Sequence, residues 1–212
     1  MKENPDRTKK IIARLKKAYP DARCTLDFKT PHQLLVATIL SAQCTDERVN
    51  IVTRDLFKKY KTPEDFARAD IKEIEQDIRS TGFFRNKARS IKESAKALIE
   101  SHNGRMPETM DQLVQLAGVG RKTASVILGA AFNKAEGIVV DTHVARLSQR
   151  LGFTTHKDPI KIERDLMTII PEKDWIIIAQ LLIDHGRAVC RARRPDCDNC
   201  ILAEYCPSAH EI

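Results

Sequence analysis

Apolar residues recur at three- and four-residue intervals along almost the whole chain, which is the pattern of amphipathic helices. The first such stretch runs from Asp6 to Tyr19 and stops at Pro20. The stretch from Leu34 to Leu40 is apolar on nearly every side, and it follows Thr30 and Pro31, which are typical of a helix start. Because a helix that is apolar all round must be buried, we expect it at the centre of a domain.

The same spacing predicts helices along the rest of the chain. One predicted helix follows Asp46, a second begins at Thr62-Pro63, a third begins at Asp70, and a fourth runs from the break at Thr81-Gly82 to Ser101. The others are predicted over Pro107–Ala117, Arg121–Ala131, Thr142–Leu151, Pro159–Ile169 and Asp174–Ala188. No stretch alternates between apolar and polar residues as a half-buried strand does. The sequence therefore predicts an all-α protein with about ten helices.

A turn that contains two glycines separates two of these predicted helices. Gly118, Val119 and Gly120 stand directly before the helix that starts at Arg121. Glycine permits positive φ and close backbone approach, so successive amides of the turn can face an anion at the helix N-terminus. A phosphodiester suits such a site, and a tight corner between helices without a ligand is the alternative.

Charged residues on both sides of the following helix are candidates for chemistry. Arg121 and Lys122 lie in its first turn, where the helix dipole disfavours cations and favours the uncharged, nucleophilic amine. A solvated surface lysine is the alternative. Asp141 follows an apolar run and is expected to cap the next helix while staying ionised. For His143 we expect a structural hydrogen bond.

Four of the six cysteines lie within the seventeen residues from 190 to 206, in the spacing C-x6-C-x2-C-x5-C. They are Cys190, Cys197, Cys200 and Cys206. Four thiols this close favour a tetrahedral thiolate site for zinc or for an iron–sulfur cluster, and the isolated first cysteine favours 4Fe-4S. Cys24 and Cys44 lie outside this group and are expected to be packed or free thiols.

The loop between the first two of these cysteines is basic. It carries Arg191, Arg193 and Arg194, whose guanidinium groups suit phosphate contact once both ends of the loop are tethered. A solvated basic loop is the alternative. The whole chain of 212 residues has a net charge of +7, which also favours a polyanionic partner.

Hydrophobic residues make up 42% of the chain, enough for a sizeable core, yet no run is long enough to span a membrane. The N-terminal residues lack the apolar segment of a signal peptide, so an intracellular protein is expected. In a reducing compartment, clustered cysteines favour a metal site over disulfides.

Taken together, these motifs resemble the endonuclease III family of DNA glycosylases with lyase activity, in the helix-hairpin-helix superfamily. The resemblance covers nearly the whole chain and rests on Leu34–Asp46, Leu116–Ala124, Val140–Val144, His185-Gly186-Arg187 and the four cysteines. It implies a six-helix domain over residues 24–135 that contains the hairpin. It also implies a discontinuous iron–sulfur cluster domain formed by residues 1–23 and 136–212, with a DNA-binding cleft between the two domains.

The resemblance further implies an activity. Lys122 would attack C1′ of an extruded oxidised pyrimidine nucleotide in duplex DNA and form a Schiff base, and Asp141 would assist, before β-elimination cleaves the strand 3′ to the abasic site. Gln43 would fill the gap left by the base, and the turn before Phe84 would supply a second wedge. The residues expected to contact DNA are Gln43, Phe84, Arg85, Gly118, Val119, Gly120, Arg121, Thr123, Arg191, Arg193 and Arg194. The expected protein is a monomer of the prokaryotic cytoplasm, associated with the nucleoid.

Other functions remain open at this point. A monofunctional adenine glycosylase of the same superfamily is disfavoured by Lys122 and by the end of the chain at Ile212. A thymine-mismatch or photoproduct glycosylase is not distinguished, because its pocket residues lie outside the motifs. A non-catalytic DNA-binding module or a zinc-dependent structural protein belongs to another class.

Overall fold

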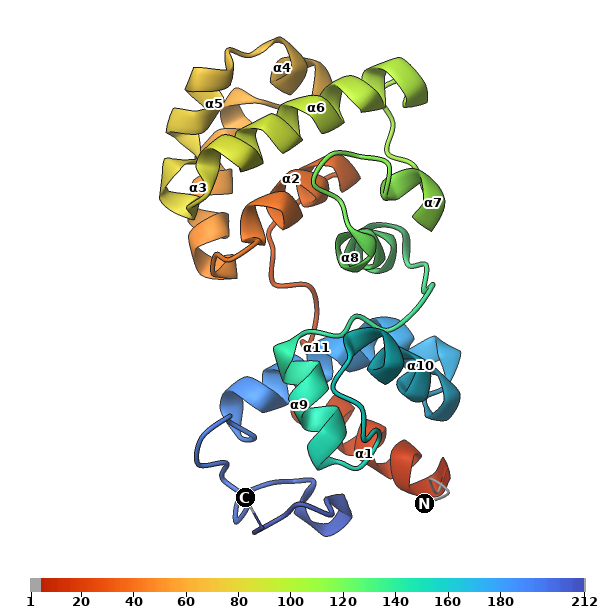
Figure 1. Ribbon diagram of the computed structural model, residues 1–212. Coiled ribbons are helices and arrows are strands. Elements are labelled where there is room, and N and C mark those ends of the chain that lie inside the picture. Colours follow the sequence, from red (N-terminus) through yellow and green to blue (C-terminus); the bar gives the residue numbers. More distant parts are fainter. Residues whose placement is uncertain (1–4, 212) are drawn as a thin grey trace. The chain divides into compact units, whose positions relative to one another are not determined.

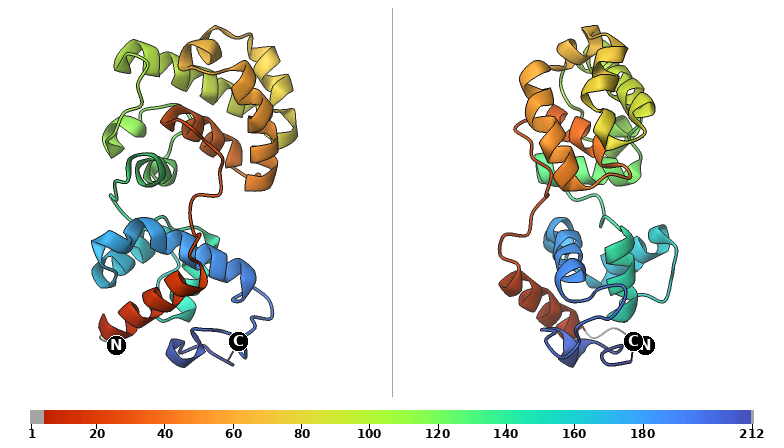
Figure 2. Two further views of the ribbon diagram at one scale, coloured as in Figure 1. Left: turned by 180° about the vertical axis from the view of Figure 1, so that it is seen from behind. Right: turned by 90° about the vertical axis from the view of Figure 1, so that its left-hand side faces the viewer.

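The computed structural model describes residues 5–211 and confirms the all-α prediction (Figure 1). Within these residues there are eleven α-helices, three short 3-10 helices and no β-strand. The chain forms two compact units, which Figure 2 shows from two further directions. The first unit is Cys24–Asn133, and the second joins the chain up to Arg23 with the chain from Lys134 onward.

The first unit is built around one buried helix, as the sequence predicted. Its elements are α2 Pro31–Ser41, α3 Asp46–Lys59, α4 Pro63–Arg68, α5 Ile71–Asp77, η1 Arg79–Thr81, α6 Phe84–His102, α7 Met110–Leu113 and α8 Arg121–Phe132. Helix α2 packs against α3, α6 and α8, and every residue from Leu34 to Leu40 is buried. Thr30 caps its start, because its hydroxyl accepts a hydrogen bond from the Gln33 amide at 3.2 Å.

Helix α7 is much shorter than the predicted Pro107–Ala117, and this prediction is wrong. The helix covers only Met110–Leu113, and the chain then continues in turns to Gly118. Leu113, Leu116 and Val119 are all buried, at intervals of three residues. The Leu116 amide donates to the Leu113 carbonyl, and the Val119 amide donates to the Leu116 carbonyl, each at 3.1 Å. Successive three-residue turns therefore produce the apolar spacing that the sequence analysis assigned to a helix.

The second unit brings both ends of the chain together. Its elements are α1 Pro5–Ala18, α9 Thr142–Arg150, α10 Pro159–Ile169, η2 Glu172–Asp174, α11 Trp175–Ala188 and η3 Ala203–Tyr205. Helix α11 packs against α9 and α1. Arg7 and Arg14 of α1 donate to the carbonyls of Tyr205 (2.9 Å) and Ile201 (2.8 Å), so the N-terminal helix is bonded directly to the cysteine segment. None of the helices in residues 5–211 is long and apolar enough to cross a membrane.

Candidate functional site

The glycine turn of the first unit rests directly on helix α6. Gly118 has φ of +77°, and a Cβ at this position would lie 2.8 Å from the Cβ of Ser90. Ser94, one turn further along α6, donates from its hydroxyl to the Ala117 carbonyl at 2.7 Å. Gly118 is therefore required both by its left-handed backbone and by the close approach of the turn to α6.

The two glycines of the turn have different backbone conformations: Gly118 uses the positive φ that glycine permits, and Gly120 does not. The φ of Gly120 is −91°, and a Cβ built there meets no atom within 4 Å. Gly120 is the N-cap of α8 and supplies no side-chain cap, whereas Thr30, Thr45 and Asp141 each cap a helix through a side-chain oxygen. An external anion is thus the natural acceptor for the first-turn amides of α8.

Val119 anchors the turn in the protein interior. Its side chain is only 6% exposed, and its amide donates to the Leu116 carbonyl at 3.1 Å. The prediction of successive free amides is therefore wrong for Val119, because its own N–H already has an acceptor.

Lys122 lies in the first turn of α8, as predicted from the sequence. Both Lys122 and Arg121 have exposed side chains, Thr123 is half-buried, and Ala124 turns into the core. The first turn of α8 therefore presents an ammonium and a guanidinium group to solvent beside an uncapped helix start.

Two further turns of the first unit carry exposed side chains on left-handed backbone. Gln43 follows the end of α2 with φ of +54°, and Phe83 precedes α6 with φ of +47°. Phe83 is 62% exposed, whereas Phe84 packs against the hydrophobic core, and the Arg85 guanidinium lies 5.6 Å from the centre of the Phe84 ring. The exposed aromatic side chain of this turn is therefore Phe83, which the sequence analysis did not include among the DNA contacts.

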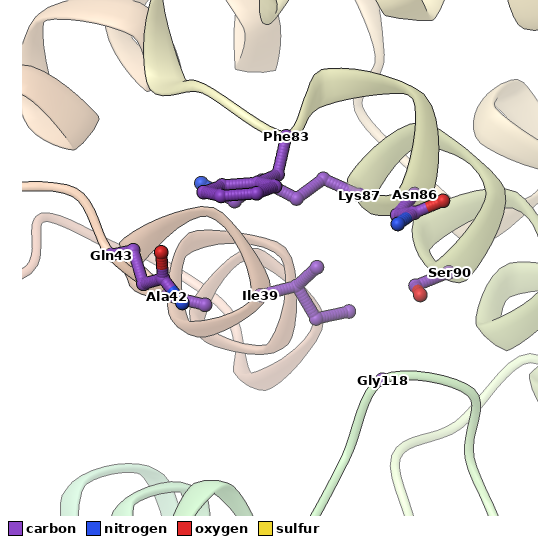
Figure 3. Close-up of a pocket in the computed structure, with 8 residues that line it drawn as sticks. All are labelled: Ile39, Ala42, Gln43, Phe83, Asn86, Lys87, Ser90 and Gly118. Atoms are coloured by element: carbon purple, nitrogen blue, oxygen red, sulfur yellow. The ribbon is translucent and has the colours of Figure 1, made fainter.

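A cavity of about 230 Å³ lies between these two turns and the glycine turn (Figure 3). Gln43 borders it from the end of α2, Phe83 and Lys87 from the start of α6, and Gly118 from the glycine turn. Lys87 is 5% exposed, and burial lowers its pKa. The sequence suggested Lys87 as one of the residues of this turn that could contact phosphate, and its burial was not predicted, although it falls in register with the buried residues of α6, among them Ile91.

In the second unit, Asp141 caps helix α9 as predicted. Its Oδ1 accepts from the Val144 amide at 2.8 Å, and its side chain stays half-exposed. The predicted structural role of His143 is also confirmed, because its Nδ1 pairs with Nη2 of Arg146 at 3.1 Å. Burial lowers the pKa of His143.

The four clustered cysteines form one group of half-buried thiols. Burial raises the pKa of Cys200, and the charges of Cys190, Cys206 and Cys197 raise it further. Arg150 Nη1 donates to Cys190 Sγ at 3.2 Å, and the Leu202 amide donates to Cys200 Sγ at 3.4 Å.

N–H···S bonds of this kind are typical of iron–sulfur sites, so the donor set fits a 4Fe-4S cluster. Within residues 5–211, no three His, Cys, Asp or Glu side chains are arranged to hold a single metal ion. A 4Fe-4S cluster takes one thiolate at each of its irons, so its ligands are spread more widely than those of one ion.

Arg150 also shapes the basic loop that follows Cys190. Its guanidinium donates to the carbonyls of Arg191 at 2.7 Å and Ala192 at 3.1 Å. Arg191, Arg193 and Arg194 are all exposed. Sequence analysis missed Arg150, because an arginine in the last turn of a helix is usually a surface residue.

A buried imidazole connects the cysteine group to the N-terminal helix. His185 Nε2 lies 3.4 Å from Cys200 Sγ, and His185 Nδ1 lies 2.9 Å from the Tyr19 hydroxyl. Burial lowers the pKa of His185 to about 4, so the ring is neutral at pH 7. A neutral ring donates from one nitrogen and accepts at the other, which allows Nε2–H to donate to the thiolate while Nδ1 accepts from Tyr19.

Comparison with known proteins defines the class. The model of the HhH-GPD superfamily base excision DNA repair proteins matches residues 36–172, and the model of the iron–sulfur binding domain of endonuclease III matches residues 190–206. The chain is therefore a helix-hairpin-helix base excision repair protein with an iron–sulfur segment.

Comparison with individual proteins identifies the family within this class. Endonuclease III of Synechocystis is 54% identical over 99% of this chain and 95% of its own length, and endonuclease III of Bacillus subtilis is 46% identical over 89% and 86%. A solved structure of a trapped covalent intermediate of endonuclease III with DNA superposes with a TM-score of 0.91 at 43% identity, covering 99% of this chain and 98% of that one. The chain belongs to the endonuclease III family. It is a base excision repair DNA glycosylase with AP lyase activity and carries a 4Fe-4S cluster.

Proposed function

We propose that this protein removes oxidised pyrimidines from duplex DNA and cleaves the resulting abasic site, with Lys122 as the nucleophile. The observation that carries the proposal is the exposed side-chain amino group of Lys122, which lies one residue past a helix start that no side chain caps. A relative that is 43% identical was solved as a covalent intermediate with DNA, which supports a nucleophilic residue in this family.

The chemistry follows from a free amine at the sugar. Nζ of Lys122 forms a bond to C1′ as the bond from C1′ to the base breaks, and the base leaves with a proton. Ring opening gives a Schiff base, which makes the C2′ proton acidic enough for removal. β-Elimination then breaks the C3′–O bond, and water releases the lysine. Asp141 would take the proton of the attacking amine or stabilise positive charge on the sugar.

Duplex DNA would be held by the first unit at two places. The amides of Gly118 and Gly120, with Arg121 and Thr123, would bind a phosphate next to the lesion. Gln43 and Phe83 would enter the base stack where the damaged nucleotide leaves it, because both side chains are exposed. This assigns the wedge to Phe83 rather than to Phe84, with Arg85 beside it as a phosphate contact.

The second unit would contribute a basic loop. The proposed cluster ligands are Cys190, Cys197, Cys200 and Cys206. When bound, the cluster closes the loop at both ends through iron–thiolate bonds. Arg191, Arg193 and Arg194 would then meet phosphates with little loss of loop entropy. The proposal includes action as a monomer on nucleoid DNA in a prokaryotic cytoplasm, and the relatives named above are bacterial.

Borohydride trapping tests the nucleophile. Incubation with abasic-site DNA and borohydride should give a covalent adduct with the wild type and none with Lys122→Ala. Lys96→Ala, which removes an exposed lysine of α6, is the matched control and should trap like the wild type. Equal adduct yields from wild type and Lys122→Ala would refute the role of Lys122.

A cleavage screen tests the substrate class. Duplexes that carry thymine glycol, an oxidised cytosine, uracil, mismatched adenine or an abasic site would be compared under single-turnover conditions. Cleavage of the first two and of the abasic site is expected. Preferential cleavage at uracil or at mismatched adenine would overturn the assignment to oxidised pyrimidines.

A further inference from the structure

Lys87 is a buried cation at the point where two exposed turns meet. Its Nζ donates to the Leu40 carbonyl at 2.8 Å and to the Thr81 carbonyl at 2.8 Å. Leu40 lies three residues before Gln43, and Thr81 lies two residues before Phe83. One ammonium group therefore ties together the main chains that lead into both turns, and its side chain borders the cavity between them (Figure 3).

Both turns need such a restraint. Gln43 and Phe83 have φ of +54° and +47°, a region that residues with a Cβ rarely occupy. Backbone of this kind persists only where the surrounding structure determines it. At each turn Lys87 bonds a main-chain carbonyl, so it restrains the backbone itself and leaves both exposed side chains unobstructed.

We propose that Lys87 is a positioning residue that holds Gln43 and Phe83 at a fixed separation, so that both side chains enter the duplex together. The inference rests on the proposed function of these two residues, which we call the insertion tips. Lys87 contacts neither the sugar nor the base in this scheme. It lowers the cost of binding because the two tips are already ordered before DNA arrives.

A lysine is suited to this position for a chemical reason. An ammonium group has three donors and can satisfy carbonyls from two chain segments at once, whereas an apolar side chain of the same length can fill the space but donates nothing. Lys87→Met therefore removes the donors and keeps the packing. Lys92→Met is the matched control: Lys92 lies on the same helix and also donates to a carbonyl, that of Ala69, which belongs to neither tip.

The experiment compares binding of these variants to two duplexes that differ only in an abasic-site analogue, with 2-aminopurine placed opposite it. Lys87→Met should lose roughly tenfold in affinity for the abasic duplex, the size expected for two side chains that must be ordered on binding. Its affinity for the undamaged duplex should be unchanged, and the change in 2-aminopurine fluorescence on binding should diminish. Lys92→Met should behave like the wild type on all three measures.

Parallel variants separate this inference from the proposed function. If Gln43→Ala and Phe83→Ala leave abasic affinity and fluorescence unchanged, the insertion tips themselves are refuted. If those variants lose binding while Lys87→Met matches Lys92→Met, the positioning role of Lys87 is refuted. An equal loss on damaged and undamaged duplexes would also refute it. If Lys87→Met melts below the assay temperature, it is compared with Lys92→Met at a lower temperature at which both variants are folded, under the same criteria.

Discussion

At the scale of single residues, the two glycines of the hairpin have different tasks, and alanine substitution should separate them. Gly118→Ala forces a Cβ onto left-handed backbone against Ser90, and we expect it to lower the free energy of unfolding by about 2 kcal/mol. Gly120→Ala meets open space and should cost less than about 1 kcal/mol of stability. Its Cβ would instead obstruct a phosphate at the start of α8, with a loss of roughly tenfold in DNA affinity.

Urea unfolding and fluorescence anisotropy with an abasic-analogue duplex would measure both quantities for each variant. Similar stability losses in the two variants would contradict the different backbone conformations of Gly118 and Gly120. Unchanged DNA affinity in Gly120→Ala would contradict the phosphate site.

His32 gives the first unit a defined dependence of stability on pH. Burial lowers its pKa from 6.5 to about 4, and its ring packs edge-on against Phe66. Between these values the unfolded chain binds a proton that the folded chain does not, so the free energy of unfolding falls as pH falls. From pH 7 to pH 5 this group should remove roughly 2 kcal/mol.

His32→Leu should lose that part of the pH dependence, as measured by urea unfolding at pH 7 and pH 5. His210→Gln, which replaces an exposed imidazole, serves as the control and should retain it. An identical drop in the wild type and in His32→Leu would show that other groups cause the acid sensitivity.

The position or role of a single residue could be predicted from the sequence where it depends on neighbours only a few residues away along the chain. The Asp141 cap depends on neighbours within three residues, and the position of Lys122 after the hairpin depends on the turn itself. The choice between Phe83 and Phe84 depends on which ring reaches the core, and the role of Lys87 depends on carbonyls from other segments. Neither is encoded in the nearby sequence, so neither was predicted.

At the scale of elements, Arg150 links helix α9 to the cysteine loop. Removal of its three hydrogen bonds in Arg150→Met should free the loop and expose the cluster, because Cys190 loses its N–H···S donor. We expect visible absorbance of the cluster to decay faster in the presence of an iron chelator. Arg164→Met, an exposed arginine of α10, is the control. Equal decay rates in both variants would refute this role.

The basic loop itself can be tested by salt dependence. Arg193→Ala with Arg194→Ala should reduce the slope of log affinity against log salt concentration by about 0.9 for each phosphate that the loop no longer neutralises. Arg68→Ala with Lys72→Ala removes two exposed charges from α4 and α5 and should leave the slope unchanged. An unchanged slope in the loop variant would mean that the loop binds no phosphate.

At the scale of elements, the prediction of a helix over Pro107–Ala117 was wrong, and the structure shows why. Most helices were predicted because their apolar period persists for three turns and their caps are explicit, as at Thr30-Pro31. The stretch before the hairpin has the same period, yet its buried residues Leu113, Leu116 and Val119 are carried by successive turns. Spacing of three alone does not separate an α-helix from repeated tight turns, and the hydrogen bonds that decide between them are invisible in the sequence.

At the scale of the whole molecule, each unit has its own hydrophobic core. One core, which includes Leu34 and Ile127, consists of residues from 26 to 128. The other, which includes Leu15 and Leu182, consists of residues 11–15 and 138–202. Periodicity could not assign the N-terminal helix to the second core, because the connection is made by contacts with the far end of the chain, among them the bonds of Arg7 and Arg14 and the packing of Leu15.

Because each unit has its own core, we expect loss of the cluster to destabilise the second unit alone. The segment 190–206 has a single fully buried side chain, Leu202, so its order depends on the bonds that its four cysteines make to iron. Cys197→Ser should abolish visible absorbance and speed hydrogen exchange in that segment and in α1, which is bonded to it. Exchange in α2 and α8 should stay slow, because their core lies wholly within the first unit. Cys24→Ser, outside the cysteine group, should change neither region. Fast exchange throughout α2 and α8 in Cys197→Ser would contradict two independent cores, and unchanged exchange in α1 would show that the cluster does not order the second unit.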